Sequence, residues 1–246
     1  GAPLMLPEVA PVPSVHDETR GVVLDAPAHC PRYCGRIIRD VHAAAPSPAW
    51  MRQRLERSGI RSISALVDVT NYVMLELGQP LHAFDNARLT GAIHVRLPGP
   101  GEKLLLLNEQ TVEPAADTAL ITDEARPLAM AGIMGGEESG ITLETRDLFL
   151  ESAFFSPDAI AGKARALGFS SDASYRYERG VDFMLQRRAI ERATQLILEI
   201  CGGRPGPVVE AVAEDCLPQR APVRLRAARA ARVIGIPFTD AQIARL

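Results

Sequence analysis

The apolar residues between Ile93 and Phe155 come in short runs, and this pattern most constrains how the chain folds. Glycine, proline, asparagine and aspartate separate the runs, as they separate the short strands of β-sheets. The runs read HVRLP, KLLLL, ALITD, PLAMAGI and DLFLESAFF. We therefore expect the middle of the chain to form a sheet of short strands, preceded by two further β segments at residues 21–24 and 33–41.

Helical patterns precede the main group of strands. In PSPAWMRQRLERSG, Ser47 is expected to be the N-cap, Pro48 the first helical residue and Gly59 the stop. In ISALVDVTNYVMLELGQP, apolar residues recur at i, i+3, i+7 and i+11 from Leu66, and Gly78 ends the pattern. The sequence therefore predicts two helices in this part of the chain.

Further helical patterns follow the strands. Ser156 and Pro157 open the segment SPDAIAGKARALG, and Gly168 closes it. The segment FMLQRRAIERATQLILEICGG is amphipathic and ends at a Gly-Gly pair. Together these patterns indicate a mixed α/β (α+β) fold class, with a short-stranded sheet and flanking helices.

Prolines and periodicity divide the chain into three parts. Residues 1–20 hold four prolines and few periodic apolar positions, so we expect a linker or an extended edge. The start, GAPLM, has neither an initiator methionine nor a signal-peptide pattern, which predicts a boundary inside a longer protein. Residues 21–216 are expected to form the main domain. In residues 217–246, Thr239 and Gln242 predict a capping box for a truncated helix, which we interpret as the start of a further small helical domain.

The composition excludes several classes of protein. The chain has 246 residues, 47% of them hydrophobic and 23% charged, which excludes a disordered chain. No apolar run approaches the roughly 20 residues that span a bilayer. The formal net charge of −3 gives no overall field that attracts a polyanion, although arginines cluster at 52–61, 176–192 and 220–232. Of the four cysteines, only Cys30 and Cys34 are close in sequence, and this pair lacks a partner Cys/His cluster, so the cysteines indicate reduced thiols rather than a zinc site. We therefore expect no metal and a cytoplasmic protein.

Glu151 is the most unusual polar residue of the predicted strands. In LFLESAFF, alternation places Phe149, Glu151 and Ala153 on one face, and a carboxylate is costly to bury without a donor. Glu151 is therefore either a carboxylate that binds a donor in a pocket or a surface residue on an edge strand. In GIMGGEESG, Gly135 and Gly136 form either a tight turn or a segment whose N–H groups donate to a ligand oxygen.

Three further polar residues lie in or just after the second predicted helix. His82 follows that helix in QPLHAFD and is either a packed, hydrogen-bonded loop residue or a catalytic residue. Thr70 and Asn71 are consecutive, so their side chains point about 100° apart and occupy adjoining strips of the helix. The sequence contains no Gly-x-Ser-x-Gly elbow, Walker loop or His-Glu-x-x-His motif. The residues alone therefore leave the chemistry open.

Three long blocks of the sequence resemble the β subunits of bacterial phenylalanyl-tRNA synthetases. They read ISALVDVTNYVMLELGQPLHAFD, GIMGGEESGI and LESAFFSPDAIAGKARALGFSSDASYRYERGVD, in the order and spacing of that family. The resemblance covers roughly residues 20–215, which correspond to the central editing region of the subunit, and from about Leu217 the chain resembles the start of the next domain. It implies an α/β editing-domain fold that is shared with a domain of tRNA-lysidine synthetase.

The resemblance also implies an editing site. The residues at the matching positions are Thr70, Asn71 and His82 on the catalytic side, and Gly135, Gly136, Glu151, Ser171 and Ala173 on the substrate side. Glu151 would accept the hydroxyl that distinguishes tyrosine from phenylalanine, assisted by N–H groups near the glycine pair. Ala173 would leave room for the aromatic ring. Many relatives carry threonine where Ser171 stands, and the missing methyl group is expected to loosen the pocket slightly.

The implied activity is hydrolysis of tyrosine wrongly attached to the tRNA for phenylalanine, by positioning of the ester and a water rather than by nucleophilic catalysis. The implied partners are the acceptor end of tRNA(Phe) and a catalytic α subunit, in an assembly of two α and two β chains without a membrane. No cofactor is expected in this region, whereas the parent ligase would use ATP and Mg²⁺ to attach phenylalanine. The alternatives are a non-catalytic module that binds tRNA or scaffolds the subunits, and a free-standing deacylase, which the chain ends argue against.

Overall fold

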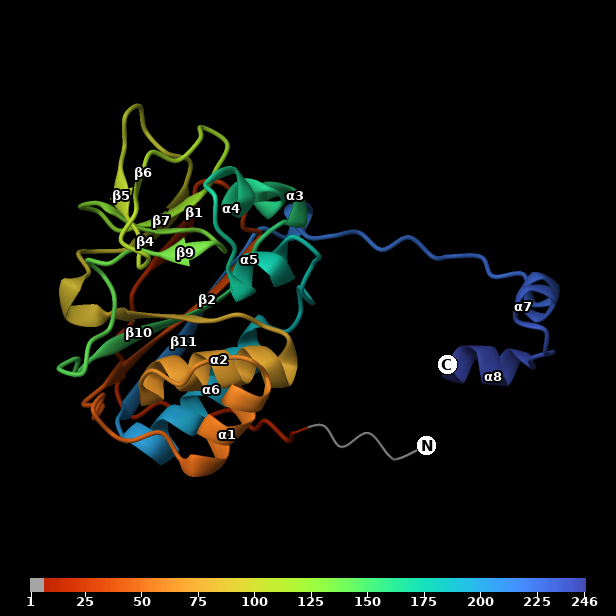
Figure 1. Cartoon of the computed structure of the whole chain (residues 1–246), viewed down its shortest axis with the longest axis horizontal. Helices are drawn as coiled ribbons and strands as arrows, with labels where there is room; N and C mark the ends of the chain where they lie inside the picture. The colour runs from red at the N-terminus through yellow and green to blue at the C-terminus, as the bar shows by residue number, and fades with distance from the viewer. Residues whose placement is uncertain (1–6) are drawn as a thin grey trace.

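The computed structural model describes residues 7–246, and its strands form two stacked sheets and a separate hairpin (Figure 1). One sheet has the order β1-β4-β7-β8-β9, the other the order β11-β2-β10-β3, and the hairpin pairs β5 with β6. Only the β1–β4 pair is parallel among the described strands. The strands are β1 (Val22–Leu24), β2 (Arg32–Arg39), β3 (His82–Asp85), β4 (Ile93–Arg96), β5 (Leu104–Leu105), β6 (Thr111–Val112), β7 (Leu120–Thr122), β8 (Pro127–Met130), β9 (Met134–Gly135), β10 (Leu148–Phe154) and β11 (Arg204–Val212).

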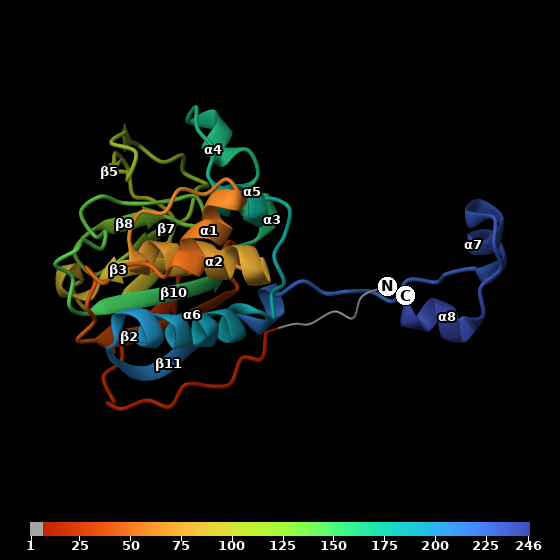
Figure 2. The ribbon, with the colours of Figure 1, turned by 60° about the horizontal axis from the view of Figure 1, so that its bottom comes forward.

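Helices cover the face of the four-stranded sheet that points away from the five-stranded sheet (Figures 1 and 2). They are α1 (Ala49–Arg57), α2 (Ala65–Leu77) and α6 (Gln186–Cys201). Three short helices follow β10 and lie beside the sheets: α3 (Pro157–Ile160), α4 (Lys163–Ala166) and α5 (Asp172–Tyr177). The four-stranded sheet is therefore the middle of three layers, with a hydrophobic core on each side.

The inner strands β2 and β10 pair along their length and are buried on both faces. On β10, Phe149 and Ala153 pack in the core between the sheets, whereas Leu148 and Leu150 pack in the core against the helices. This alternation follows from the period of two along a strand. It confirms the predicted face that Phe149 and Ala153 share with Glu151.

Both helices that were predicted before the main strands are present, but Ser47 does not cap the first one. Helix α1 follows Pro48, which is its N-cap and makes no side-chain capping bond. The Ser47 hydroxyl instead donates to the carboxylate of Asp68 in α2, at 2.5 Å. Asp68 is a buried acceptor, so the Ser47 side chain is directed toward Asp68 rather than toward the backbone N–H groups at the N-terminus of α1. Helix α2 ends at Gly78, whose φ of 78° provides the predicted left-handed cap.

Other segments differ from the prediction in detail. The segment SPDAIAGKARALG forms two short helices, α3 and α4, rather than one, because Gly162 adopts φ 78° between them and interrupts the helical hydrogen bonds. Residues 82–85 form β3 where the sequence predicted a loop after the second helix. Strand β11 was not predicted at all. The amphipathic segment before the Gly-Gly pair forms α6, as expected.

The N-terminal segment is extended and bonded to the main body. In residues 7–20, the Val12 N–H donates to Glu191 of α6, and Arg36 of β2 donates both to Glu191 and to the Val12 carbonyl. The Val15 N–H donates to the carbonyl of Pro205 in β11. Residues 1–6 of the predicted linker lie outside the described residues.

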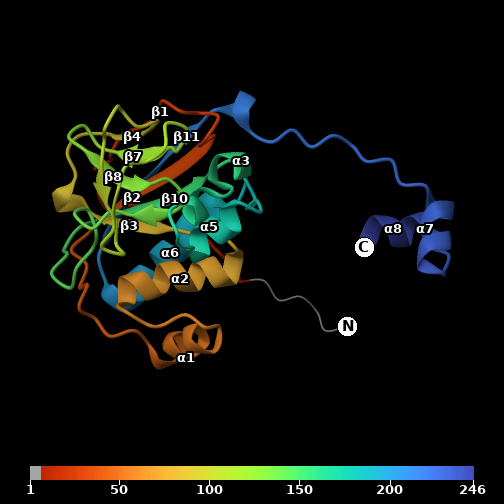
Figure 3. The ribbon, with the colours of Figure 1, turned by 45° about the horizontal axis from the view of Figure 1, so that its top comes forward.

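The C-terminal segment extends away from the sheets and ends in two helices, α7 (Ala227–Ile234) and α8 (Asp240–Arg245) (Figures 1 and 3). Neither helix contains a buried residue. The predicted capping box is present, since Thr239 and Gln242 each accept a hydrogen bond from the backbone N–H of the other. Within residues 7–246, no helix combines the length and the apolar composition needed to cross a membrane.

We expect Asp68→Ala to lower the free energy of unfolding by about 2–4 kcal/mol, because buried donors would lose their acceptor. Asp68 is fully buried and accepts hydrogen bonds from the hydroxyls of Ser47 and Ser62 and from the Ile63 N–H. Urea unfolding followed by circular dichroism measures the change. Asp117→Ala serves as the control, because the Asp117 side chain is 72% exposed and its removal should change the free energy of unfolding much less. Equal losses in the two variants would contradict this role of Asp68.

Candidate functional site

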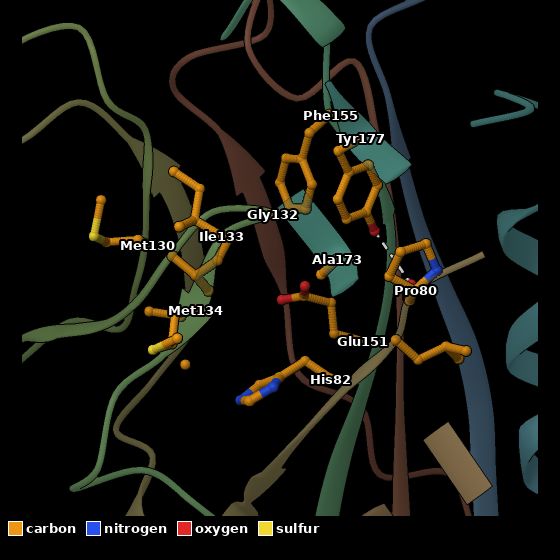
Figure 4. Close-up of a pocket in the computed structure, with 14 residues that line it drawn as sticks. Pro80, His82, Met130, Gly132, Ile133, Met134, Glu151, Phe155, Ala173 and Tyr177 are labelled. Atoms are coloured by element: carbon orange, nitrogen blue, oxygen red, sulfur yellow. Dashed lines mark hydrogen bonds between the residues drawn. The ribbon is translucent and has the colours of Figure 1, made fainter. Parts of the chain in front are cut away.

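A cavity lies between the two sheets, beside β3, β9, β10 and α5 (Figure 4). Its volume is about 380 Å³, part of which is open to solvent. Its lining resembles that of small-molecule sites, which combine apolar walls with a few polar groups. The apolar walls include Ile121, Met130, Ile133, Met134 and Phe155, and the polar groups belong to His82, Glu151 and Tyr177.

Glu151 places a carboxylate in the wall of this cavity. Strand β10 is an inner strand between β2 and β3, and only 6% of the Glu151 surface is exposed, so the alternative of a surface residue on an edge strand is wrong. The Tyr33 hydroxyl donates to Oε2 of Glu151 at 2.7 Å. Oε1 accepts no hydrogen bond from residues 7–246, which leaves this oxygen free to bind a ligand.

Burial dominates the ionisation of Glu151. It raises the pKa of the carboxyl to about 7, while the hydrogen bond from Tyr33 opposes the rise. The carboxyl therefore holds its proton to a higher pH than an exposed glutamate does. Burial also raises the pKa values of Cys30, Tyr33 and Tyr177 well above their ordinary values, so these neighbours stay neutral.

His82 lies directly across from Glu151 in the β3–β10 pairing. Its Nε2 atom is buried and has no hydrogen-bond partner among the described residues, in contrast to the hydrogen-bonded loop residue that the sequence allowed. The ring packs edge-on against Phe84, with 4.4 Å between ring centroids. Burial lowers the pKa of His82 to about 4, so the imidazole is neutral at pH 7. A neutral ring nitrogen without a partner suits a water or a polar ligand atom.

The glycine pair provides space, whereas the predicted donor at Gly136 is not available. A Cβ on Gly135 would lie 2.5 Å from the Cε1 of His82, so this glycine makes room for the imidazole. Gly135 lines the cavity, whereas Gly136 does not. The Gly136 N–H donates to the carbonyl of Leu128 at 2.8 Å, so it is occupied within the sheet and does not face a ligand. This corrects the expectation that both glycines offer N–H groups.

Helix α5 supplies the wall opposite the carboxylate (Figure 4). Ala173 is half-buried and lines the cavity, and Tyr177, one turn later, lines it as well. Ser171 is the N-cap of α5 and does not line the cavity. Its hydroxyl donates to the carbonyl of Ile133 at 2.7 Å, which ties the start of α5 to the loop before β9. Ser171 therefore positions the wall rather than contacting the cavity.

Thr70 and Asn71 do not reach the cavity. Both are half-buried residues of α2, and neither lines the cavity. The Thr70 hydroxyl donates to the carbonyl of Val67 within its own helix, at 2.8 Å. The apolar face of α2 packs in the core on the other side of the four-stranded sheet, which separates the helix from the cavity.

The sequence analysis missed several polar residues in and around the cavity, among them Tyr33, Gln79 and Tyr177. Tyr33 binds the carboxylate from β2, and nothing in its local sequence distinguishes it from an ordinary core tyrosine. Gln79 is fully buried, and its amide donates to the carbonyls of Pro80 and Ala153, both at 2.8 Å, while the Tyr177 hydroxyl lies 3.1 Å from the same nitrogen. The position of Gln79 between Gly78, which ends α2, and Pro80 was the one local feature of the sequence that pointed to this hydrogen-bond network.

The arrangement suits a ligand that is apolar apart from one hydrogen-bond donor. The walls accept an apolar body, the free oxygen of Glu151 accepts a donor, and neutral His82 offers a second polar contact. In the part of the chain that the structure describes, no group of three or more His, Cys, Asp or Glu residues is arranged to hold a metal ion.

Comparison with known proteins relates this chain to one family. A family model described as the B3/4 domain matches residues 29–202. Phenylalanine–tRNA ligase beta subunits of Aromatoleum aromaticum and Dechloromonas aromatica are 70% and 68% identical to the chain over all 246 residues. The same subunit of Chromobacterium violaceum is 60% identical over 243 residues. The chain spans 31% of the length of each of these relatives.

A solved structure shares the fold. It is the crystal structure of an N-terminal fragment of the phenylalanyl-tRNA synthetase beta-subunit from Pyrococcus horikoshii, with a TM-score of 0.50 and 14% sequence identity. The match covers 98% of this chain and 66% of that chain. The sheets and flanking helices confirm the predicted α/β class, whereas the expected likeness to tRNA-lysidine synthetase stays a prediction.

We expect the stability difference between Glu151→Gln and the wild-type chain to change with pH. The pKa of Glu151 is raised from its ordinary value of 4.5 to about 7, so the stability that its protonated form contributes is complete below pH 4.5 and is lost as the pH rises through 7. Glutamine does not titrate, so the variant should gain up to about 3 kcal/mol relative to the wild type over this range. The lowered pKa of His82 acts with the opposite sign but is common to both proteins.

Urea unfolding of both proteins at about pH 4.5, 6 and 7.5 measures this difference. The Glu138→Gln variant is a suitable control, because its side chain is 64% exposed and its difference from the wild type should stay nearly constant. A constant difference for Glu151→Gln as well would contradict a raised pKa in the folded state.

Proposed function

The chain belongs to the B3/4 domain family, and from that membership we propose that it hydrolyses the ester of tyrosine mistakenly attached to tRNA(Phe). Relatives that share its sequence over its whole length are named phenylalanine–tRNA ligase beta subunits, which makes phenylalanine the amino acid that the site must reject. The observation that carries the proposal is Glu151, a buried carboxylate with one free oxygen in a cavity that is otherwise mostly apolar.

The carboxylate accounts for a preference for tyrosine. A tyrosyl ring in the cavity would donate its phenolic proton to Oε1 of Glu151, whereas a phenylalanyl ring would leave that oxygen buried and without a partner. Sites that hydrogen-bond a substrate hydroxyl discriminate against the analogue that lacks it by about 10⁴ to 10⁵. Ala173 supports this assignment, because a small residue in the wall leaves volume for the ring.

At the ester end, we assign His82 to orientation of the ester carbonyl or a water. Its neutral ring and unpartnered Nε2 suit that task, and the close approach of Gly135 holds the ring in place. The proposal is positioning of the reactants rather than nucleophilic attack by the protein. In this proposal, Thr70 and Asn71 do not contact the bound ring, because they lie on α2 outside the cavity.

The proposed partners follow from the same family relation. They are the acceptor end of tRNA(Phe) and the catalytic α subunit, in an assembly of two α and two β chains. We propose residues 21–216 as the editing domain and residues 217–246 as the start of a separate helical domain. ATP and Mg²⁺ are assigned to the ligation reaction of a whole synthetase, and no step proposed for this chain uses them.

We expect the wild-type chain to release tyrosine from tRNA(Phe) much faster than phenylalanine, and Glu151→Ala to reduce this preference by at least about 10²-fold. The physical reason is that alanine removes the acceptor for the phenolic hydroxyl and also the penalty for an unpaired oxygen. Release of radiolabelled amino acid from the two aminoacyl-tRNAs measures the preference. Glu138→Ala, at an exposed glutamate, should keep it. Binding of tRNA without release of either amino acid would favour the non-catalytic alternative.

We expect Ala173→Trp to abolish release of tyrosine while the protein stays folded. The indole would occupy the volume of the tyrosyl ring, and an open cavity accepts a larger side chain without the strain of about 1–3 kcal/mol found in filled cores. Thermal unfolding and the same release assay check both parts. Ala166→Trp is the matched control, since Ala166 is an exposed alanine of α4. Normal release by folded Ala173→Trp would place the reaction outside this cavity.

A further inference from the structure

We propose that Tyr33 is a positioning residue, whose hydroxyl holds Oε2 of Glu151 and thereby presents Oε1 as the single acceptor for the hydroxyl of the bound side chain. The identity of the substrate rests on the proposed function. The effect of Tyr33 on the position and ionisation of Glu151 does not depend on that function. Tyr33 does not line the cavity, so it acts on the ligand through the carboxylate.

The geometry comes from the pairing of β2 with β10. Tyr33 lies opposite Ala153 and Glu151 lies opposite Gly35, so the two side chains are diagonal neighbours on the same face of the sheet. The hydroxyl reaches Oε2 at 2.7 Å, within the range of charge-assisted hydrogen bonds between a hydroxyl and a carboxylate. Tyr33 has no exposed surface, so its ring has no solvent into which it can turn.

The close pairing of Glu151 with Gly35 helps to fix this geometry. A Cβ on Gly35 would lie 2.3 Å from Cζ of Phe149, which shows that the Phe149 ring fills the space beside Gly35. The ring is completely buried in the core between the sheets. The Phe149 ring therefore occupies space beside the pair, which leaves Tyr33 and Glu151 little room to move apart.

Among residues 7–246, no neighbouring charge stabilises the ionised carboxylate. The titratable groups that face Glu151 are Tyr33 on β2, Cys30 just before β2, His82 on β3 and Tyr177 on α5. Burial raises the pKa values of Cys30, Tyr33 and Tyr177, and lowers that of His82, so all four are neutral at pH 7. Strands β8 and β9 contribute only apolar residues and glycine to the lining.

The Tyr33 hydroxyl is therefore the one group of the described chain that donates to the carboxylate, and it opposes the effect of burial on the pKa of Glu151. Without this hydroxyl, both oxygens would compete for the ligand and the carboxyl would hold its proton to higher pH. A protonated carboxyl is a poorer acceptor for a phenol than a carboxylate. Tyr33 thus maintains both the direction and the charge of the group that recognises the ligand.

The direct test is a titration of Glu151 in the whole 246-residue chain without substrate, followed by ¹³C NMR of the labelled side-chain carboxyl. In Tyr33→Phe, we expect the midpoint to rise by about one pH unit, as the loss of a hydrogen bond to a charged group implies. Site-specific 3-fluorotyrosine at position 33 is a stronger donor and should lower the midpoint. This second variant keeps the ring and the bond, so it tests the proposal even if Tyr33→Phe fails to fold.

Tyr177→Phe is the matched control. It removes another buried phenol of the same cavity, but the Tyr177 hydroxyl bonds to the carbonyls of Pro80 and Ala153 and not to Glu151. We expect its midpoint to match the wild type. A shift of equal size in Tyr33→Phe and Tyr177→Phe, or no shift in either variant at position 33, would overturn the proposal.

The second readout is the pH profile of amino acid release from tyrosyl-tRNA(Phe). In Tyr33→Phe, the pH at which release becomes half-maximal should rise with the Glu151 midpoint, and KM should increase more than kcat decreases. A uniform loss of rate with an unchanged profile would show a merely structural role and would overturn the proposal. If the wild type releases no tyrosine, the proposed function fails, whereas the substrate-free titration still decides whether Tyr33 controls Glu151.

Discussion

The burial of β2 and β10 on both faces is the constraint on which the rest of the structure depends. On two inner strands without a solvent-facing side, a polar side chain loses its contact with water, and burying it without a partner costs free energy. On the face toward the helices, the three guanidinium nitrogens of Arg36 donate to Glu191 and to the carbonyls of Gly206 and Val12, which fastens the N-terminal segment. Glu151, on the face toward the other sheet, receives one donor and keeps one oxygen free. The same constraint thus produces a structural cluster on one side and the candidate site on the other.

The architecture was largely predictable, because local periodicity determines most of its elements. The short apolar runs formed strands, and the spacing from Leu66 formed α2 up to the glycine at its end. The failures have local causes that a pattern does not contain. Gly162 adopts a left-handed conformation and divides one expected helix, and the buried Asp68 takes the hydroxyl that was expected to cap α1.

The candidate site was predictable only in part, because its residues meet through tertiary pairing. The structure brings His82, Gly135, Glu151 and Ala173 to one cavity, as the family resemblance implied, whereas Thr70 and Asn71 stay on a helix behind the sheet. Tyr33 was missed since its partner lies 118 residues further along the chain. A core tyrosine and a carboxylate-binding tyrosine look alike in sequence, and only the register of two strands separates them.

The contacts of the cavity also determine when it forms. Its polar centre joins β2 to β10, and its walls come from β3, β8, β9 and α5, so few of its contacts are local in sequence. Contacts between distant segments carry a large entropy of loop closure and form late in folding. A partly folded chain, even one with α2 and α6 in place, would lack this cavity. The selectivity that we propose for the site would therefore depend on the completed fold, and its measurement would report whether folding has finished.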